Sequence, residues 1–130
     1  MRILLVVAGL VQLSIVAASL MAPRVLKWRE ELARLTPLTR TIFWTYACYI
    51  SATNLALALV SLRGDWLLTG EPLARAVATY GALYWGVRFV LQMTCYRKHA
   101  PQGKWFAAAD AAFTLAFAFA AGVFAAAAVA

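Results

Sequence analysis

The sequence is poor in the residues that build metal and redox centres. Its 130 residues include two cysteines, Cys48 and Cys95, and a single histidine, His99. The cysteines do not form the Cys-x-x-Cys pair that a thiol-redox enzyme of the membrane would use. One histidine cannot supply bis-histidine haem ligation or a histidine-rich metal site. The sequence therefore predicts no metal site, and we interpret both cysteines as packing residues.

Acidic residues are also scarce, with 5 Asp and Glu against 12 Lys and Arg and a formal net charge of +7. The acids are too scattered for a carboxylate dyad, and the chain has no Walker loop, dinucleotide fingerprint or serine nucleophile elbow. A basic chain can bind nucleic acid, but here the basic residues alternate between the loops that separate apolar segments. We therefore predict no nucleic-acid partner, and no motif identifies a catalytic mechanism.

Apolar residues are abundant, at 65% of the chain against 13% charged residues, and the mean hydropathy is +0.77. Soluble domains carry about 25% charged residues. Four apolar segments cover residues 3–22, 41–62, 76–96 and 105–128. Each reaches the roughly 20 residues that a helix needs to cross a hydrocarbon core. The sequence predicts an all-α integral membrane protein, with one domain over residues 1–130 built as a four-transmembrane-helix bundle.

The distribution of Lys and Arg predicts how the chain is oriented. Eight basic residues lie in loops 23–40 and 97–104, and three lie on the opposite side of the predicted membrane. Cytoplasmic loops retain Lys and Arg, so both basic loops are expected in the cytoplasm and both termini outside. The alanine-rich composition and the compact loops favour a bacterial inner membrane, which would make the termini periplasmic.

The first basic loop carries a helical pattern of its own. Val25, Trp28, Leu32 and Leu35 recur at spacings of three and four, with charged residues between them. This pattern predicts a short amphipathic helix of about three turns in the first cytoplasmic loop. It either lies in the lipid interface with its cations near anionic headgroups, or joins the first two spans as a surface segment.

Arg88, near the middle of the third apolar segment, is the residue that most needs a partner. A charge at the centre of a membrane helix costs at least about 2.5–3.5 kcal/mol on insertion scales. Gly81, Tyr84, Arg88, Gln92 and Cys95 share one helical face, which is expected to point into the bundle. Asp110 is the only acid within an apolar segment and lies at a similar depth on the next helix. The sequence predicts an intramembrane ion pair between Arg88 and Asp110.

The other polar residues within the spans allow two interpretations. They can hydrogen-bond between helices, with about 0.6–2 kcal/mol for each contact. Alternatively, some of them bind an anionic headgroup, a carboxylate or a cofactor tail in a cavity open to the cytoplasmic leaflet. The candidate ligand-binding residues are Arg88, Gln92, Tyr84, Tyr46, Tyr49 and Asn54. No specific cofactor is indicated.

The fourth segment is dominated by alanine, which supplies 14 of the residues from 105 to 130. One stripe of the helix carries Phe106, Asp110, Phe113, Phe117 and Phe124, and we expect it to face the bundle. The other side carries small residues, which let helix backbones approach closely. We expect this side to face a second protomer, another subunit or simply lipid. Its residues are Ala107, Ala108, Ala111, Ala118, Gly122 and Ala125.

Three functions fit these patterns, and membrane lipids are partners in each. The first is a non-catalytic structural or accessory subunit of a membrane assembly, or a self-associating bundle. The second is a small membrane enzyme with a lipophilic substrate and a site between protomers. The third is a small transporter that binds an anion or a lipid headgroup at Arg88.

The second function is prompted by a loose resemblance in architecture. In span count, length, outside N-terminus and cytoplasmic first loop, the chain is similar to the membrane-associated proteins of eicosanoid and glutathione metabolism. The resemblance implies a trimer that uses glutathione. Members of that family place an acidic residue alongside asparagine on the second helix, whereas the second segment here has Asn54 and no Asp or Glu.

Overall fold

Four long helices make up most of the computed structural model, which describes residues 1–99 and 102–130. They are α1 (Arg2–Val25), α3 (Pro37–Leu62), α5 (Pro72–Leu91) and α7 (Lys104–Val129). Short helices α2 (Trp28–Leu32), α4 (Gly64–Leu67) and α6 (Arg97–His99) lie between them, and a π-helical turn, Gln92–Tyr96, joins α5 to α6. The described residues form no strand. The prediction of an all-helical chain is confirmed.

Two of the long helices begin where proline follows a residue in extended conformation. Thr36 accepts a hydrogen bond from the Thr39 backbone N–H at 3.4 Å, and Pro37 is the first residue of α3. Pro72 opens α5 in the same way after Glu71. Proline suits this position because the first turn leaves its N–H groups unpaired anyway. Both helices therefore start four residues before the apolar segments predicted at 41 and 76.

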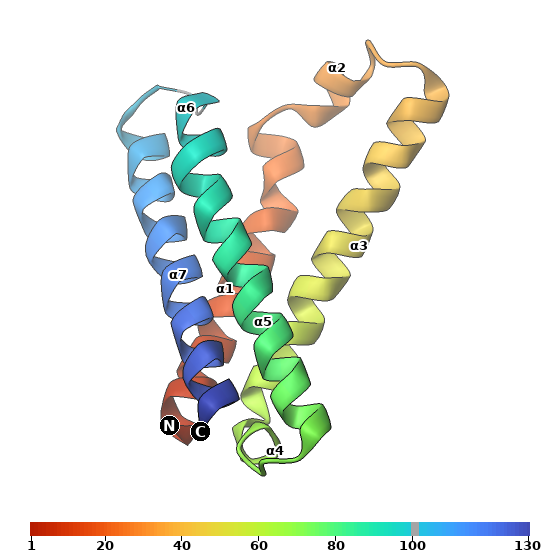
Figure 1. Cartoon of the computed structure of the whole chain (residues 1–130). Coiled ribbons are helices and arrows are strands. Elements are labelled where there is room, and N and C mark those ends of the chain that lie inside the picture. Colours follow the sequence, from red (N-terminus) through yellow and green to blue (C-terminus); the bar gives the residue numbers. More distant parts are fainter. Residues whose placement is uncertain (100–101) are drawn as a thin grey trace.

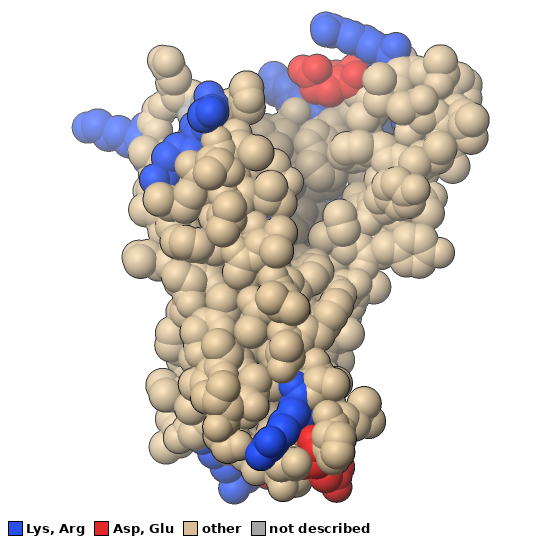
Figure 2. Space-filling model, viewed as in Figure 1, with Lys and Arg blue, Asp and Glu red and all other residues tan. Residues whose placement is uncertain are grey.

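The long helices run up and down between two ends of the molecule (Figure 1). Both chain termini and α4 lie at one end, which we call the terminal end, and α2 and α6 lie at the other, the basic end. Helix α5 packs along α7, and α1 packs against both α3 and α7. Toward the basic end α3 leans away from α5, and the space-filling view is hollowed between them (Figure 2).

Aromatic rings and small residues bring the helices together. Trp85 of α5 stacks on Phe117 of α7 with ring centroids 5.5 Å apart, and both are buried. Gly81 lies directly over the buried ring of Phe124, because a Cβ built there would be 2.8 Å from that ring. Between α1 and α3, Gly9 meets Leu62 in the same way. The absence of a Cβ at these glycines is what permits the close packing.

Within the described residues, three helices are long and apolar enough to cross a membrane: α1, α3 and α7. The protein is thus a helical protein with the composition of a multi-pass membrane protein. Helix α5, with 20 residues that include Arg75 and Arg88, does not meet the same criterion. The prediction of membrane-spanning helices is supported for three of the four predicted segments.

The amphipathic helix of the first basic loop is shorter than predicted. Helix α1 continues to Val25, Lys27 adopts a left-handed backbone with φ of 55°, and α2 comprises only five residues. The left-handed residue interrupts the pattern that the spacing predicted. The apolar side of α2 faces α3, since Trp28 contacts Phe43 edge-on at 4.9 Å and Leu32 is buried.

Candidate functional site: a polar cluster between α5 and α7

A hydrogen-bonded group of side chains connects α5, α6 and α7 near the basic end. We call Arg88, Gln92, Arg97, Asp110 and Thr114 the polar cluster. Gln92 donates from Nε2 to Asp110 Oδ1 at 2.7 Å, and Arg88 Nη1 donates to Gln92 Oε1 at 3.3 Å. Arg97 donates from Nε to Asp110 Oδ2 at 3.0 Å and from Nη2 to Thr114 Oγ1 at 3.3 Å. Both carboxylate oxygens of Asp110 thus have partners from this chain.

The ion pair of the cluster differs from the predicted one. Arg97 Nη2 lies 2.9 Å from Asp110 Oδ2, and this is the only salt bridge in the part of the chain that the structure describes. Arg88 reaches Asp110 only through the side chain of Gln92. The predicted direct pair between Arg88 and Asp110 is therefore wrong. Asp110 pairs with Arg97, and Arg88 is linked to Asp110 through the side chain of Gln92.

The π-helical turn explains why Arg97 replaces Arg88. In a regular α-helix, nine residues at about 100° each would place Arg97 about half a turn away from Arg88. The turn over Gln92–Tyr96 contains more residues than an α-helical turn and winds the chain more slowly, which shifts Arg97 toward α7. The same shift leaves Cys95 exposed, although it was predicted to share the inward face of Arg88.

The guanidinium of Arg88 packs against two aromatic side chains. Its guanidinium carbon lies 4.2 Å from the ring centroid of Tyr96 and 4.7 Å from that of Phe117. A cation over an aromatic face gains about 0.5–2 kcal/mol, more where water is excluded. In the described residues, the only buried polar side-chain atom without a partner is Nε of Arg40, so no buried nitrogen of Arg88 lacks a partner. The charge is accommodated by the chain's own side chains.

The predicted ligand-binding residues do not form one site. Arg88 and Gln92 lie together in the polar cluster, whereas the Tyr84 hydroxyl donates to Asn54 Oδ1 and links α5 to α3. Tyr46 and Tyr49 are 63% and 67% exposed on α3. The six residues thus divide into a polar cluster, a hydrogen-bonded pair and two exposed tyrosines.

Further contacts between helices involve residues outside the predicted site. The buried Trp85 donates from Nε1 to Gln12 Oε1 at 3.0 Å, and Gln12 donates in turn to the Ala8 carbonyl at 3.1 Å. Ser61 donates to the carbonyl of Leu5 at 2.6 Å. Gln12, Ser61 and Trp85 thus take part in contacts between helices, whereas most Thr hydroxyls of the long helices donate to a carbonyl four residues earlier in their own helix. The position of the polar residue Gln12 within an apolar segment of the sequence could have identified this contact between helices.

The potential metal-ligating side chains of the described residues lie apart from one another. Residues 1–99 and 102–130 contain no group of three or more His, Cys, Asp or Glu placed to hold a metal ion. Cys48 and Cys95 are both free and exposed. No family model, curated protein or solved structure matches this chain. A function can therefore be proposed only from the sequence and the geometry of this chain.

Proposed function

We propose that this chain is a non-catalytic, four-span membrane protein that associates with a second copy of itself or serves as an accessory subunit. The observation that carries the proposal is the packing of Arg88 against two aromatic rings, together with its hydrogen bond to Gln92. A charge that is hydrogen-bonded and packed by its own chain can have a structural role without any ligand. An anion-binding or catalytic arginine needs open space in front of its guanidinium.

The count of four spans rests on a parity argument. Both chain termini lie at the same end of the molecule, and the long helices alternate in direction (Figure 1). If α1, α3 and α7 cross a membrane, the chain returns to its starting side only when α5 crosses as well. The two aromatic contacts of Arg88 and its bond to Gln92 reduce the cost of placing α5 in the hydrocarbon core.

The orientation follows from the distribution of charge. On the face shown in Figure 2, charged side chains gather at the two ends of the molecule, and the surface between them is uncharged. The loops that join α1 to α3 and α5 to α7 hold eight of the 12 Lys and Arg residues. The proposal therefore places the basic end in the cytoplasm and both termini outside. The alanine-rich composition favours a bacterial inner membrane.

The association surface is the side of α7 that this chain leaves uncovered. Seven exposed residues follow each other at alternating spacings of three and four, the spacing of a coiled-coil seam. Five of them are alanine or glycine, which allow a close helix contact, while Phe117 and Phe124 are buried on the other side. A second α7 is the simplest partner for such a surface. The residues are Ala108, Ala111, Leu115, Ala118, Gly122, Ala125 and Val129.

Native mass spectrometry of the complex, extracted gently from its own membrane, tests the proposal. We expect a homo-oligomer, or this chain together with larger subunits, and in either case no small molecule bound near Arg88. A monomer that retains an anionic small molecule, and loses it in the Arg88→Gln variant, would contradict the proposal. That result would favour the transporter or enzyme interpretations.

Cysteine cross-linking then identifies the surface. In a Cys48→Ser/Cys95→Ser background, Ala118→Cys is expected to form a disulfide-linked dimer under mild oxidation. Val87→Cys is the matched control, because Val87 is also mid-helix and 57% exposed, but lies on α5. Equal cross-linking at both positions would mean that collisions, rather than an α7 seam, produce the dimer.

A further inference from the structure

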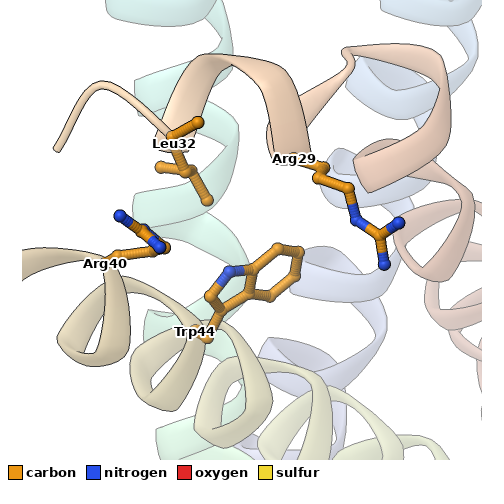
Figure 3. Close-up of a pocket in the computed structure, with 5 residues that line it drawn as sticks. Arg29, Leu32, Arg40 and Trp44 are labelled. Carbon is orange, nitrogen blue, oxygen red and sulfur yellow. The ribbon is translucent and has the colours of Figure 1, made fainter. Parts of the chain in front are cut away.

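A cavity of about 390 Å³ lies between α2 and the first turns of α3, away from the polar cluster (Figure 3). Two arginines from different elements line it, Arg29 from α2 and Arg40 from α3. The remaining lining residues are Leu32, Ala33 and Trp44. Its volume is within the range of small-molecule sites. We call this cavity the arginine pocket.

The cations of the arginine pocket lack anionic partners among residues 1–99 and 102–130. The one salt bridge of the described residues is Arg97–Asp110, so neither Arg29 nor Arg40 is paired with an acid. Arg40 Nη2 donates to the Leu35 carbonyl at 3.2 Å, but its Nε is buried without any partner. A buried charged donor left unpaired is unfavourable. Glu30 and Glu31 belong to α2 but do not line the pocket.

One wall of the arginine pocket is aromatic and apolar. The indole of Trp44 lies between the guanidinium groups of Arg40 and Arg29 in Figure 3, and Leu32 points toward it from α2. Trp44 is held in place by Trp28 and Phe43, with ring centroids 5.9 and 6.0 Å away. Its Nε1 has no acceptor among the described residues and is a further donor. The pocket thus combines donors for an anion with a surface for apolar atoms.

The position of the arginine pocket favours a membrane lipid over a free anion. Helix α3, which can cross a membrane by length and composition, begins at Pro37, so Arg40 and Trp44 occupy its first two turns. Trp and Arg prefer this headgroup level at the end of a span. Leu38 and Ile42, on the same turns, are 71% and 41% exposed, and an acyl chain can contact them.

We propose that the arginine pocket binds the phosphate of an anionic phospholipid, with Arg29 and Arg40 on the phosphate and the acyl chains along α3. Arginine suits this role because its planar guanidinium presents two parallel N–H donors to phosphate oxygens. The lipid would join the loop that contains α2 to the start of α3.

The test uses the delipidated full-length protein in detergent and measures lipid adducts by native mass spectrometry. The probes are phosphatidylglycerol, which is anionic, and phosphatidylcholine with the same acyl chains. Phosphatidylglycerol is expected to bind more tightly, and Arg40→Gln or Arg29→Gln to weaken its binding roughly tenfold each, the effect of losing one charge-assisted hydrogen bond. Arg34→Gln is the matched control, because it removes the same charge from the same loop but does not line the pocket.

Three outcomes would overturn the proposal. An equal loss of binding in Arg34→Gln would mean a diffuse electrostatic attraction rather than a site. Equal binding of both lipids would remove the role of headgroup charge. Displacement of phosphatidylglycerol by a comparable concentration of inorganic phosphate would assign the pocket to free phosphate.

The Arg40→Lys variant separates the effect of geometry from that of charge. It keeps the positive charge and loses the planar guanidinium, so its affinity for phosphatidylglycerol is expected to lie between those of the wild type and Arg40→Gln.

Discussion

The carboxylate of Asp110 is held by Arg97, which precedes it by 13 residues, at 2.9 Å. This pair joins the residue that directly follows the π-helical turn to α7. Gln92 occupies the other carboxylate oxygen and connects Arg88 to the same group. The Asp110 carboxylate thus contacts Gln92 of the π-helical turn and Arg97 of α6 directly, and Arg88 of α5 through Gln92.

The first prediction distinguishes the two arginines as partners of Asp110. Arg97→Asp lowers the melting temperature in detergent, because it places two carboxylates together, and the swap Arg97→Asp/Asp110→Arg restores most of the loss. The swap Arg88→Asp/Asp110→Arg does not, since Arg88 has no direct contact with Asp110 in this arrangement. Rescue by the Arg88 swap alone would mean that the direct pair is the one that stabilises the protein.

The second prediction concerns the close contact of α5 and α7 at Gly81. Gly81→Ala places a Cβ 2.8 Å from the fully buried Phe124 ring and is expected to destabilise the protein by about 1–3 kcal/mol, as overpacking does. Gly86→Ala is the control, because nothing lies within 4 Å of its Cβ, and it should be neutral or slightly stabilising. Reversible unfolding in mixed detergent measures both. If the two variants are equally stable, α5 and α7 are farther apart than described.

The third prediction concerns the link between α3 and α5. Tyr84→Phe leaves the buried Asn54 without its hydroxyl donor and should cost about 0.6–1.7 kcal/mol, the range for hydrogen bonds between membrane helices. Tyr80→Phe is the control, since Tyr80 is 53% exposed. The double variant Tyr84→Phe/Asn54→Leu should recover part of the loss, because it removes the unpaired amide as well. Additive losses in the double variant would argue against this hydrogen bond.

The fourth prediction concerns Arg88 as a structural residue. Arg88→Met replaces the guanidinium by a shorter, flexible apolar side chain that can still pack against Tyr96 and Phe117. It loses the cation–π contacts but also removes the cost of a partly buried charge, so the variant should fold with a stability close to that of the wild type. Arg88→Glu should fold poorly, because it places an acid between two aromatic faces beside Gln92. Yield and melting temperature after extraction from the membrane give the comparison. A well-folded Arg88→Met protein that has lost a cellular activity would instead indicate a functional arginine.

The fifth prediction concerns the exposed side of α7. Ala118→Ile adds bulk at the centre of the proposed seam and should reduce the dimer fraction severalfold without changing the stability of the monomer, since Ala118 touches little within its own chain. Ala120→Ile should instead destabilise the fold, because Ala120 is fully buried. Size-exclusion chromatography with light scattering measures the first effect. An unchanged dimer fraction in Ala118→Ile would place the association surface elsewhere.

The long helices, and the side on which α7 packs, could be predicted because apolar periodicity and helix-start signals are local. The Thr36-Pro37 and Glu71-Pro72 pairs mark where α3 and α5 begin. The division of α7 into a phenylalanine side and an alanine side is confirmed for Phe117 and Phe124, which are buried, and for Ala118 and Gly122, which are exposed.

The side-chain partners were less predictable, because they depend on departures from regular helix geometry. A helical wheel assumes a constant rotation for each residue, and the π-helical turn breaks that assumption between Arg88 and Arg97. The left-handed Lys27 similarly ends the pattern of the first loop and brings Arg29 close to Arg40. Neither departure has a signature in the composition or spacing of the residues.

The lean of α3 gives the molecule a wedge shape, wider at the basic end than at the terminal end (Figure 1). In a bilayer, such a wedge displaces more lipid area from one leaflet than from the other. The surrounding membrane would relieve that mismatch by bending, and we expect the protein to favour membranes whose curvature matches its taper. A change in the angle between α3 and α5 would therefore alter the curvature stress around the molecule.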